Sequence, residues 1–314
     1  MTNEQMSHIK VSICVPIYGT EKYIQRCAIS LFEQTYPYIE YIFVNDCTKD
    51  ASIIILNDIL NRYPQKKVQT KILSHTYNRG LAASRLTGLE NASGGYIWFV
   101  DSDDYVEIEA IEKCIQFLKD KPDLLIFNYI SEYSNTKIKS NVESVSVNDI
   151  LTFRVSPSIW KCIIKKDIFF KYNIYPIEGI NFSEDLLLLG RLIIVSNRIV
   201  VLKDHFFYHY FCNNPNSYMG TISLKSRKNL IECVLLLLKF YKSLGCESKY
   251  KKGLSFLLAD SYFSFALHYG LSNPIMIKAK MAIKDLSFFV YIITRISIIL
   301  KSKILLKIYK STIK

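Results

Sequence analysis

The chain has 314 residues, of which 50% are hydrophobic and 22% charged, so it can bury a large core and is not a mostly disordered protein. Eleven glycines and eight prolines exclude a collagen-like or low-complexity chain. The formal net charge is +12, and residues 275–314 hold eight lysines, one arginine and one aspartate. A basic end on a nearly balanced body indicates an anionic partner, either a membrane surface or a nucleic acid.

The eight cysteines include no CxxC pair, so neither a zinc site nor a redox motif is indicated. Several lie within apolar runs, which predicts reduced, packed thiols in a cytoplasmic compartment. The first ten residues are polar, and we expect no signal peptide there.

The first 130 residues alternate short apolar runs with helical patterns. The predicted strands are 11–16, 41–45, 68–73, 96–100 and 124–129. The predicted helices are 21–33, 51–60, 81–91 and 107–119. This alternation is typical of βαβ units and a mostly parallel sheet, in which ligands bind beyond the carboxyl ends of the strands. The segments that follow the strands are therefore the ones expected to carry function: 17–21, 46–50, 75–79 and 101–104.

The second half is less regular. Residues 131–160 are polar and predict no element, whereas 181–196 has a helical pattern and 199–202 reads as a strand. Long helical patterns follow over 223–243, 252–269 and 275–310. The change of pattern near residue 220 predicts a boundary between an α/β body and a helical region.

The basic end contains no predicted membrane span. Only nine residues, 286–294, precede Arg295 without a charge, and a span needs roughly 20 apolar residues. On a helix, Lys303, Lys307 and Lys310 share one face. Two interpretations stay open, namely a helix lying on an anionic membrane surface and a helix packed on the core with solvated lysines.

Three carboxylates, Asp101, Asp103 and Asp104, crowd the end of an apolar strand. In an extended segment, residues i and i+2 point the same way, so Asp101 and Asp103 face one ligand. Carboxylate oxygens suit Mg²⁺ or Mn²⁺ bound together with substrate phosphates. The alternative is a solvated acidic loop before the next helix.

Other strand ends offer groups for a nucleotide. Asp46 can accept from a base or a ribose hydroxyl, or else cap the turn that follows it. Tyr18 presents an aromatic face, while Asn78 and Arg85 lie near a helix start where phosphate binds readily. Together these positions predict a nucleotide–metal site.

These residues carry a resemblance to the family 2 glycosyltransferases of bacterial surface-polysaccharide synthesis. The motifs that resemble that family are 11–18, 44–50, 78–85, 94–104, Trp160-Lys161, 182–185 and Tyr208-His209-Tyr210 with Ser217. Four positions depart from the usual pattern: Gly19, Asn45, Cys47 and Leu86.

The resemblance implies an α/β GT-A fold with a mostly parallel central sheet, followed by a C-terminal helical region. Residues 1–220 would form the transferase domain, with a nucleotide-binding half over about 10–125 and an acceptor half over 126–220. Residues 221–314 would form the helical region with its basic apolar tail.

The same resemblance implies roles for individual residues. Asp185 would be the general base, with Glu184 beside it. Asp103 would be the principal metal ligand, joined by Asp101 and His209. The implied donor-binding residues are Pro16, Tyr18, Glu21, Asp46, Asn78, Arg85, Asp101 and Ser102.

The predicted activity is transfer of a hexosyl or N-acetylhexosaminyl group, with inversion and with Mn²⁺ or Mg²⁺. The donor would be a nucleotide-diphosphate sugar, with UDP expected. The acceptor would be a hydroxyl of a glycan or lipid-linked glycan at the inner face of the cytoplasmic membrane. One alternative is a nucleotidyltransferase, although residues 17–21 lack the Gly- and Lys-rich loop that such enzymes use. The other is a non-catalytic protein that binds nucleotide or nucleic acid.

Overall fold

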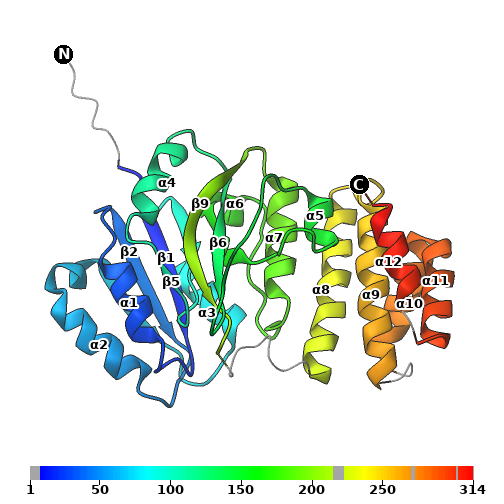
Figure 1. Ribbon diagram of the computed structural model, residues 1–314, viewed down its shortest axis with the longest axis horizontal. Coiled ribbons are helices and arrows are strands. Elements are labelled where there is room, and N and C mark those ends of the chain that lie inside the picture. The colour runs from blue at the N-terminus through cyan, green and yellow to red at the C-terminus, as the bar shows by residue number, and fades with distance from the viewer. Residues whose placement is uncertain (1–7, 215–222, 270–272, 302, 314) are drawn as a thin grey trace. The chain divides into compact units, whose positions relative to one another are not determined.

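The computed structural model describes residues 8–214, 223–269, 273–301 and 303–313 (Figure 1). The chain divides into two compact units. Unit 1 comprises 1–144, 159–179 and 195–216, and unit 2 comprises 145–158, 180–194 and 217–314. Each unit is described by itself below.

Unit 1 is built on a mixed β-sheet with the strand order β3-β2-β1-β4-β8-β6-β9-β5, and β7 pairs with β6. Its half formed by β3, β2, β1 and β4 is wholly parallel. Strand β8 is antiparallel to both β4 and β6, whereas β6 and β9 are parallel. The strands are β1 (Val11–Ile17), β2 (Ile39–Asn45), β3 (Thr70–Ser74), β4 (Tyr96–Phe99), β5 (Tyr105–Val106), β6 (Leu124–Glu132), β7 (Lys137–Lys139), β8 (Cys162–Lys165) and β9 (Ile199–Phe211).

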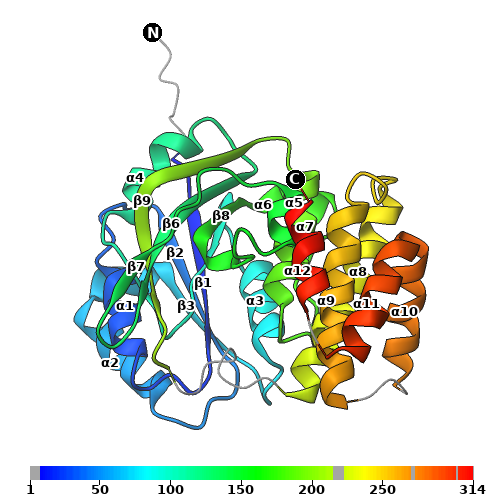
Figure 2. The same ribbon diagram turned by 45° about the vertical axis from the view of Figure 1, so that its right-hand side comes forward.

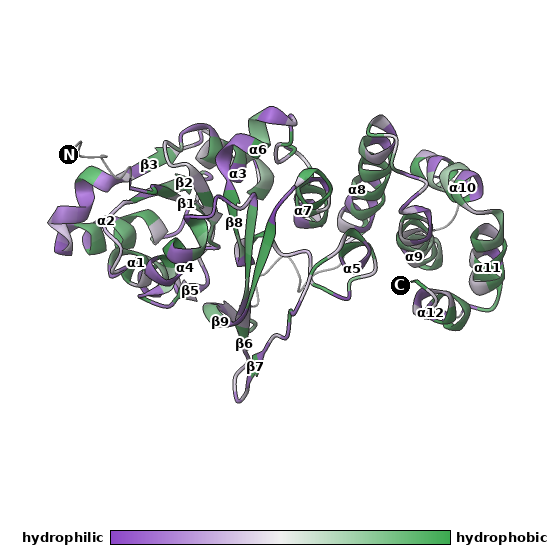
Figure 3. Cartoon of the chain, turned by 90° about the horizontal axis from the view of Figure 1, so that it is seen from above, coloured by the Kyte–Doolittle hydropathy of each residue, from purple (hydrophilic) through white to green (hydrophobic). Residues whose placement is uncertain are grey.

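Helices cover both faces of this sheet (Figure 3). One face carries α1 (Ile24–Phe32), α2 (Ser52–Arg62) and α4 (Ala110–Leu118), whose apolar residues join the main core. The other face carries α3 (Leu81–Glu90) and α6 (Lys166–Lys171). The 3₁₀ segments η1 (Pro64–Gln69) and η2 (Ile159–Lys161) complete the unit.

Strand β1 is buried on both faces, which explains why its sequence is apolar apart from Ser12. Val11, Ile13 and Val15 belong to the core that includes α1 and α2. Cys14 points the other way and meets Gly88 of α3, where an added Cβ would lie 2.9 Å from the Cys14 Cβ. The glycine lets α3 approach the sheet at this point.

Gly94, which leads into β4, lies against the backbone of β1. A Cβ at this position would lie 2.8 Å from the Lys10 carbonyl oxygen and 2.8 Å from the Ser12 nitrogen. The Gly94 N–H also donates to Ser12 Oγ over 2.9 Å.

Backbone cannot yield as a flexible side chain does, so Gly94→Ala is expected to destabilise the protein by about 1–3 kcal/mol in urea unfolding. The matched control is Gly95→Ala, because a Cβ there meets nothing within 4 Å. Equal stability of the two variants would contradict this account.

Unit 2 is helical (Figure 2). Helix α9 packs against α8, α10, α11, α12 and α5. The helices are α5 (Val147–Leu151), α7 (Glu184–Val195), α8 (Leu224–Ser243), α9 (Lys251–Tyr269), α10 (Pro274–Leu286), α11 (Phe288–Ile299) and α12 (Ile304–Ser311). No helix among the residues that the structure describes is both long enough and apolar enough to cross a membrane.

The single helical pattern predicted over 275–310 is wrong, because the structure has three helices there. Ser287 separates α10 from α11, with an extended backbone and a side chain that accepts from the Val290 N–H. Such a serine begins a new helix by supplying an acceptor to its first turn. Within this arrangement, Lys303 and Lys310 contact residues of α9 instead of lining an open face. Lys303 pairs with Asp260 at 2.9 Å, and Lys310 lies over the Phe256 ring.

Candidate active site at the carboxyl ends of the parallel strands

Asp46 follows β2 and is buried where α3 begins. Its Oδ1 accepts from the Arg79 N–H over 2.8 Å and lies 2.7 Å from His75 Nδ1. Its Oδ2 accepts from the Gly80 N–H over 2.7 Å. Gly80 has a φ of 91°, which glycine adopts without steric cost. The carboxylate therefore fixes the segment 78–80 at the site, and the base contact expected of Asp46 stays a prediction.

Two departures from the family pattern shape the turn after β2. Asn45 Oδ1 accepts from the Thr48 N–H over 2.9 Å, so this amide rather than Asp46 closes the turn. Cys47, where the family commonly has glycine, has a φ of 58°. A side chain is uncommon in this left-handed region, so Cys47 holds backbone strain beside the site.

Asp101 lies just beyond β4 and pairs with Arg85 of α3. Arg85 Nη2 is 2.9 Å from Asp101 Oδ1, and the Arg85 side chain is only 1% exposed. A buried guanidinium needs a carboxylate partner, so this ion pair fixes where Asp101 points. The predicted donor residue Arg85 and the predicted metal ligand Asp101 are thus brought together.

Asp104 is fully buried and holds the acidic loop, residues 101–104, through hydrogen bonds to β9. The Tyr208 hydroxyl donates to Asp104 Oδ2 over 2.6 Å and accepts from the Asp101 N–H over 3.1 Å. Asp104 Oδ1 accepts from the Phe211 N–H over 2.7 Å. The Tyr208 ring stacks on Trp160 with centroids 4.4 Å apart. Trp160 and Tyr208, which belong to two of the family-like motifs, therefore hold the acidic loop in place.

Arg26 and Asn214 hold Asp103, and the sequence did not single out either of them. Arg26 Nη2 donates to the Asp103 carbonyl over 3.0 Å, and Asn214 Nδ2 donates to Asp103 Oδ2 over 2.7 Å. The Arg26 guanidinium lies over the Tyr105 and Phe211 rings, 4.5 and 4.8 Å from their centroids. These two cation–π contacts restrain the guanidinium.

The chemistry of Asp101 and Asp103 fits a divalent cation shared with phosphates. Burial and the neighbouring charge of Asp101 raise the pKa of the Asp103 carboxyl. A cation would relieve both effects. Among the described residues, no group of three or more His, Cys, Asp and Glu is arranged to hold a metal. Mg²⁺ bound with substrate phosphates commonly takes only one or two protein carboxylates, so two ligands suffice.

His209, the predicted third metal ligand, contacts two carboxylates in this structure. Its Nε2 lies 2.6 Å from Glu107 Oε1, and its Nδ1 lies 3.0 Å from Glu132 Oε1. Its ring stacks on Tyr105 with centroids 4.2 Å apart. Both nitrogens are occupied by carboxylates, so in this structure His209 joins β5 to β9, and we leave it out of the proposed metal site.

The loop after β1 is open to solvent and tied to the loop after β2. Tyr18 is 55% exposed, which leaves its aromatic face available to a flat ring. Glu21 Oε2 accepts from the Ala51 N–H over 3.1 Å, and the Glu21 N–H donates to Asp50 Oδ2 over 2.9 Å. These two bonds set the spacing of the loops between which a base would lie.

The other expected donor contacts differ in exposure. Pro16 is buried inside β1, where it is the register partner of Val44. Asn78 is exposed just before α3. Ser102 is 4% exposed between the two aspartates. Of these three, only the Asn78 side chain is open to a ligand without a rearrangement.

The predicted catalytic pair opens α7 in unit 2. Glu184 and Asp185 form its first turn, after Ser183 with a φ of 63°. Carboxylates are stabilised there by the helix dipole. The donor residues belong to unit 1, so the catalytic roles of Asp185 and Glu184 stay predictions. Ser217 lies outside the described residues.

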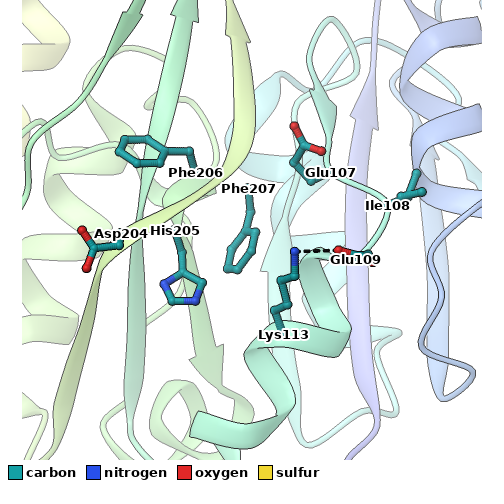
Figure 4. Close-up of a pocket in the computed structure, with 8 residues that line it drawn as sticks. All are labelled: Glu107, Ile108, Glu109, Lys113, Asp204, His205, Phe206 and Phe207. Atoms are coloured by element: carbon teal, nitrogen blue, oxygen red, sulfur yellow. Dashed lines mark ion pairs between the residues drawn. The ribbon is translucent and has the colours of Figure 1, made fainter.

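Two cavities are lined by residues of unit 1. One, of about 380 Å³, is lined by Glu107, Ile108, Glu109, Lys113, Asp204, His205, Phe206 and Phe207 (Figure 4). None of these is a predicted site residue, and Lys113 is paired with Glu109 at 2.6 Å. The other, of about 690 Å³, is lined by residues of α1, of β5 and of the segments next to them, including Glu21, Arg26 and Tyr105. It borders the acidic loop through Arg26.

The chain is similar in sequence to known glycosyltransferases. The model of glycosyl transferase family 2 matches residues 12–175. The putative glycosyltransferase EpsH of Bacillus subtilis (strain 168) is 41% identical over 126 residues, which are 40% of this chain and 35% of EpsH. The poly(ribitol-phosphate) beta-N-acetylglucosaminyltransferase TarS of Staphylococcus aureus (strain Mu50 / ATCC 700699) is 25% identical over 279 residues, which are 86% of this chain and 47% of TarS. The matched part is thus less than half the length of either relative.

Solved structures share the fold. The S. aureus TarS 1–349 complex with UDP-GlcNAc has a TM-score of 0.64 at 21% identity and covers 94% of this chain and 93% of that chain. The mannosyltransferase PcManGT of Pyrobaculum calidifontis, in complex with GDP-Man and Mn²⁺, has a TM-score of 0.55 at 14% identity. It covers 94% of this chain and 88% of that chain. The predicted α/β GT-A fold with C-terminal helices is confirmed. Since the family model matches over half of the sequence, the protein belongs to glycosyltransferase family 2.

Proposed function

We propose that the chain is a metal-dependent, inverting glycosyltransferase that uses a nucleotide-diphosphate sugar. The observation that carries this proposal is the acidic loop, in which Asp101 and Asp103 follow β4 and are fixed by Arg85, Arg26 and Asn214. It stands at the edge of the sheet where β1 and β2 also end, which is where α/β sheets bind ligands.

Each part of the site has a chemical task. A divalent cation held by Asp101 and Asp103 would neutralise the charge that develops on the leaving nucleoside diphosphate. Tyr18 would face the base, and Arg85 would keep Asp101 oriented. Asp185 would accept the proton of the attacking hydroxyl, and a single displacement of this kind inverts the anomeric carbon.

For the donor we propose a UDP sugar, with a hexosyl or N-acetylhexosaminyl group. The support is the relationship to TarS, whose structure holds UDP-GlcNAc. For the acceptor we propose a hydroxyl of a glycan or lipid-linked glycan in polysaccharide synthesis at the inner face of the cytoplasmic membrane. Of the two ions proposed, Mn²⁺ is present in the PcManGT structure.

The test is thermal unfolding of the protein with UDP, GDP or CDP, each with and without Mn²⁺. At a hundredfold excess over Kd, a ligand adds about 2.7 kcal/mol of stability, which raises Tm by about 5 °C in a protein of this size. We expect that shift with UDP and only in the presence of Mn²⁺. Absence of a shift with every nucleotide, or release of pyrophosphate instead of UDP during turnover, would overturn the proposal.

A further inference from the structure

Helix α11 buries its small polar side chains and exposes its large apolar ones. Thr294 and Ser297 are 1% and 0% exposed, and together with Val290 they form its buried face. Phe289 and Ile299 are 66% and 74% exposed. A helix packed on a globular core normally turns its apolar residues inward. The reversed arrangement of α11 indicates that its outer face has an apolar partner.

The exposed apolar residues run along one side of α11 and onto both neighbouring helices. Phe288, Ile292 and Ile296 recur every four residues, which aligns them on one stripe. Helix α11 contacts both α10 and α12. We call the whole set the α11 surface, with members Ile277, Met281, Phe288, Phe289, Ile292, Ile296, Ile299, Leu300, Ile304 and Ile308, each at least 39% exposed. Single exposed apolar residues are ordinary, but ten on three consecutive helices are not.

Exposed basic side chains accompany this surface. They are Lys278, Lys280, Lys284, Arg295, Lys301 and Lys307. The same three helices carry one acidic residue, Asp285. Apolar side chains with basic neighbours are the composition of helices that bind at the boundary between lipid headgroups and acyl chains.

Charge distinguishes between the two occupants that an apolar face can have. A second copy of the chain would bring the same lysines against one another, and like charges across an interface cost free energy. A surface of anionic lipid complements them, at about 1 kcal/mol for each basic residue near the headgroups. With 12 residues, α11 is about 18 Å long, which suits a helix lying in the interfacial plane.

From these observations we infer that the α11 surface docks the protein on a membrane that contains anionic lipid. Phe288, Phe289 and the isoleucines of α11 enter the boundary between headgroups and acyl chains, while the flanking lysines contact the headgroups. This inference differs from the lysine face predicted from sequence, because Lys303 and Lys310 are engaged by Asp260 and Phe256. It is independent of the proposed sugar chemistry, since docking needs no nucleotide.

The test is flotation of the full chain with vesicles of phosphatidylcholine alone or mixed with phosphatidylglycerol. We expect binding to the mixed vesicles, weakened by added salt. The variant Phe289→Gln/Ile296→Gln/Ile299→Gln is expected to bind at least about tenfold more weakly, because three exposed anchors are lost without a change of charge. The variant Lys278→Gln/Lys284→Gln/Lys307→Gln is expected to lose only the preference for anionic vesicles.

A matched control places the same change on other exposed apolar residues. Ile54, Val68 and Ile138 of unit 1 are 66%, 94% and 53% exposed, and Ile54→Gln/Val68→Gln/Ile138→Gln is expected to float as the unchanged protein does. Thermal unfolding with and without UDP and Mn²⁺ verifies that every variant is folded and measures nucleotide binding separately. The inference is overturned if the unchanged protein ignores anionic vesicles, or if the α11 variant binds them equally well. It is also overturned if the protein without lipid is a dimer that the α11 variant dissociates.

Discussion

The Asp103→Asn variant is expected to lose at least about 10³-fold in kcat for sugar transfer and all of the Mn²⁺-dependent stabilisation by UDP. The physical reason is that Asp103 would supply one of the two carboxylates of the proposed metal site. An amide oxygen carries no charge with which to hold a cation against a diphosphate. Initial rates of UDP release with a sugar acceptor, and thermal unfolding with UDP and Mn²⁺, measure the two effects.

The stability of the Asp103→Asn variant without ligand separates lost chemistry from lost folding. A carboxyl group whose pKa is raised on folding costs free energy when it is ionised, so it destabilises the folded protein at neutral pH. The amide removes that cost and still reaches Asn214, so the variant is expected to unfold at the same or a higher temperature. Asp58→Asn, on the exposed side of α2, is the matched control and should change neither kcat nor the unfolding temperature. Transfer by Asp103→Asn at the unchanged rate would refute the role of Asp103.

The Asp185→Asn variant is expected to lower kcat by about 10²–10⁴-fold, the usual contribution of a general base, while UDP still binds. Binding should survive because the proposed donor contacts are all in unit 1, whereas Asp185 opens α7 in unit 2. The measurement pairs steady-state rates with the Mn²⁺-dependent thermal shift by UDP. A large loss of kcat with an unchanged shift assigns Asp185 to the acceptor step.

Glu184→Gln provides the comparison for Asp185→Asn, because both residues lie in the first turn of α7 and feel the same helix dipole. We expect Glu184→Gln to lower kcat by less than about tenfold, since an accessory carboxylate only adjusts the pKa of the base. If the two variants lose activity equally, the assignment of a single base to Asp185 fails.

Strands β1, β2 and β4 could be predicted from sequence because they are almost wholly buried and read as mostly apolar runs. Strand β3 is only partly buried. Strands β1, β2 and β4 fall within a few residues of their predicted ranges. Strand β5 has two residues and no pattern of its own, since it exists only by pairing with β9. Strand β9 was predicted to end at residue 202, but it continues to Phe211. Its register against β6 shifts at Asn128, which interrupts the alternation of the sequence and hides the second part of the strand.

The site was predictable where chemistry and position coincide in the sequence. Asp101 and Asp103 follow a predicted strand, and Arg85 belongs to the preceding family-like motif, residues 78–85. The residues that hold this loop were not predictable in the same way. Arg26 has no distinguishing neighbour on α1, and Asn214 follows a strand whose end was not foreseen. Their roles arise from tertiary contacts, which local patterns do not encode.

The acidic loop depends on partners that come much later in the chain. Tyr208, Phe211 and Asn214 contact Asp104 and Asp103 across 104, 107 and 111 residues. Contacts of such separation form late, because the intervening loop must first close at a cost in entropy. A growing chain can therefore assemble its parallel half-sheet while the carboxylates of the loop remain unsupported. If the loop holds a cation as proposed, nucleotide binding is expected only after residue 214 has left the ribosome, and a half-synthesised chain is not expected to sequester the donor.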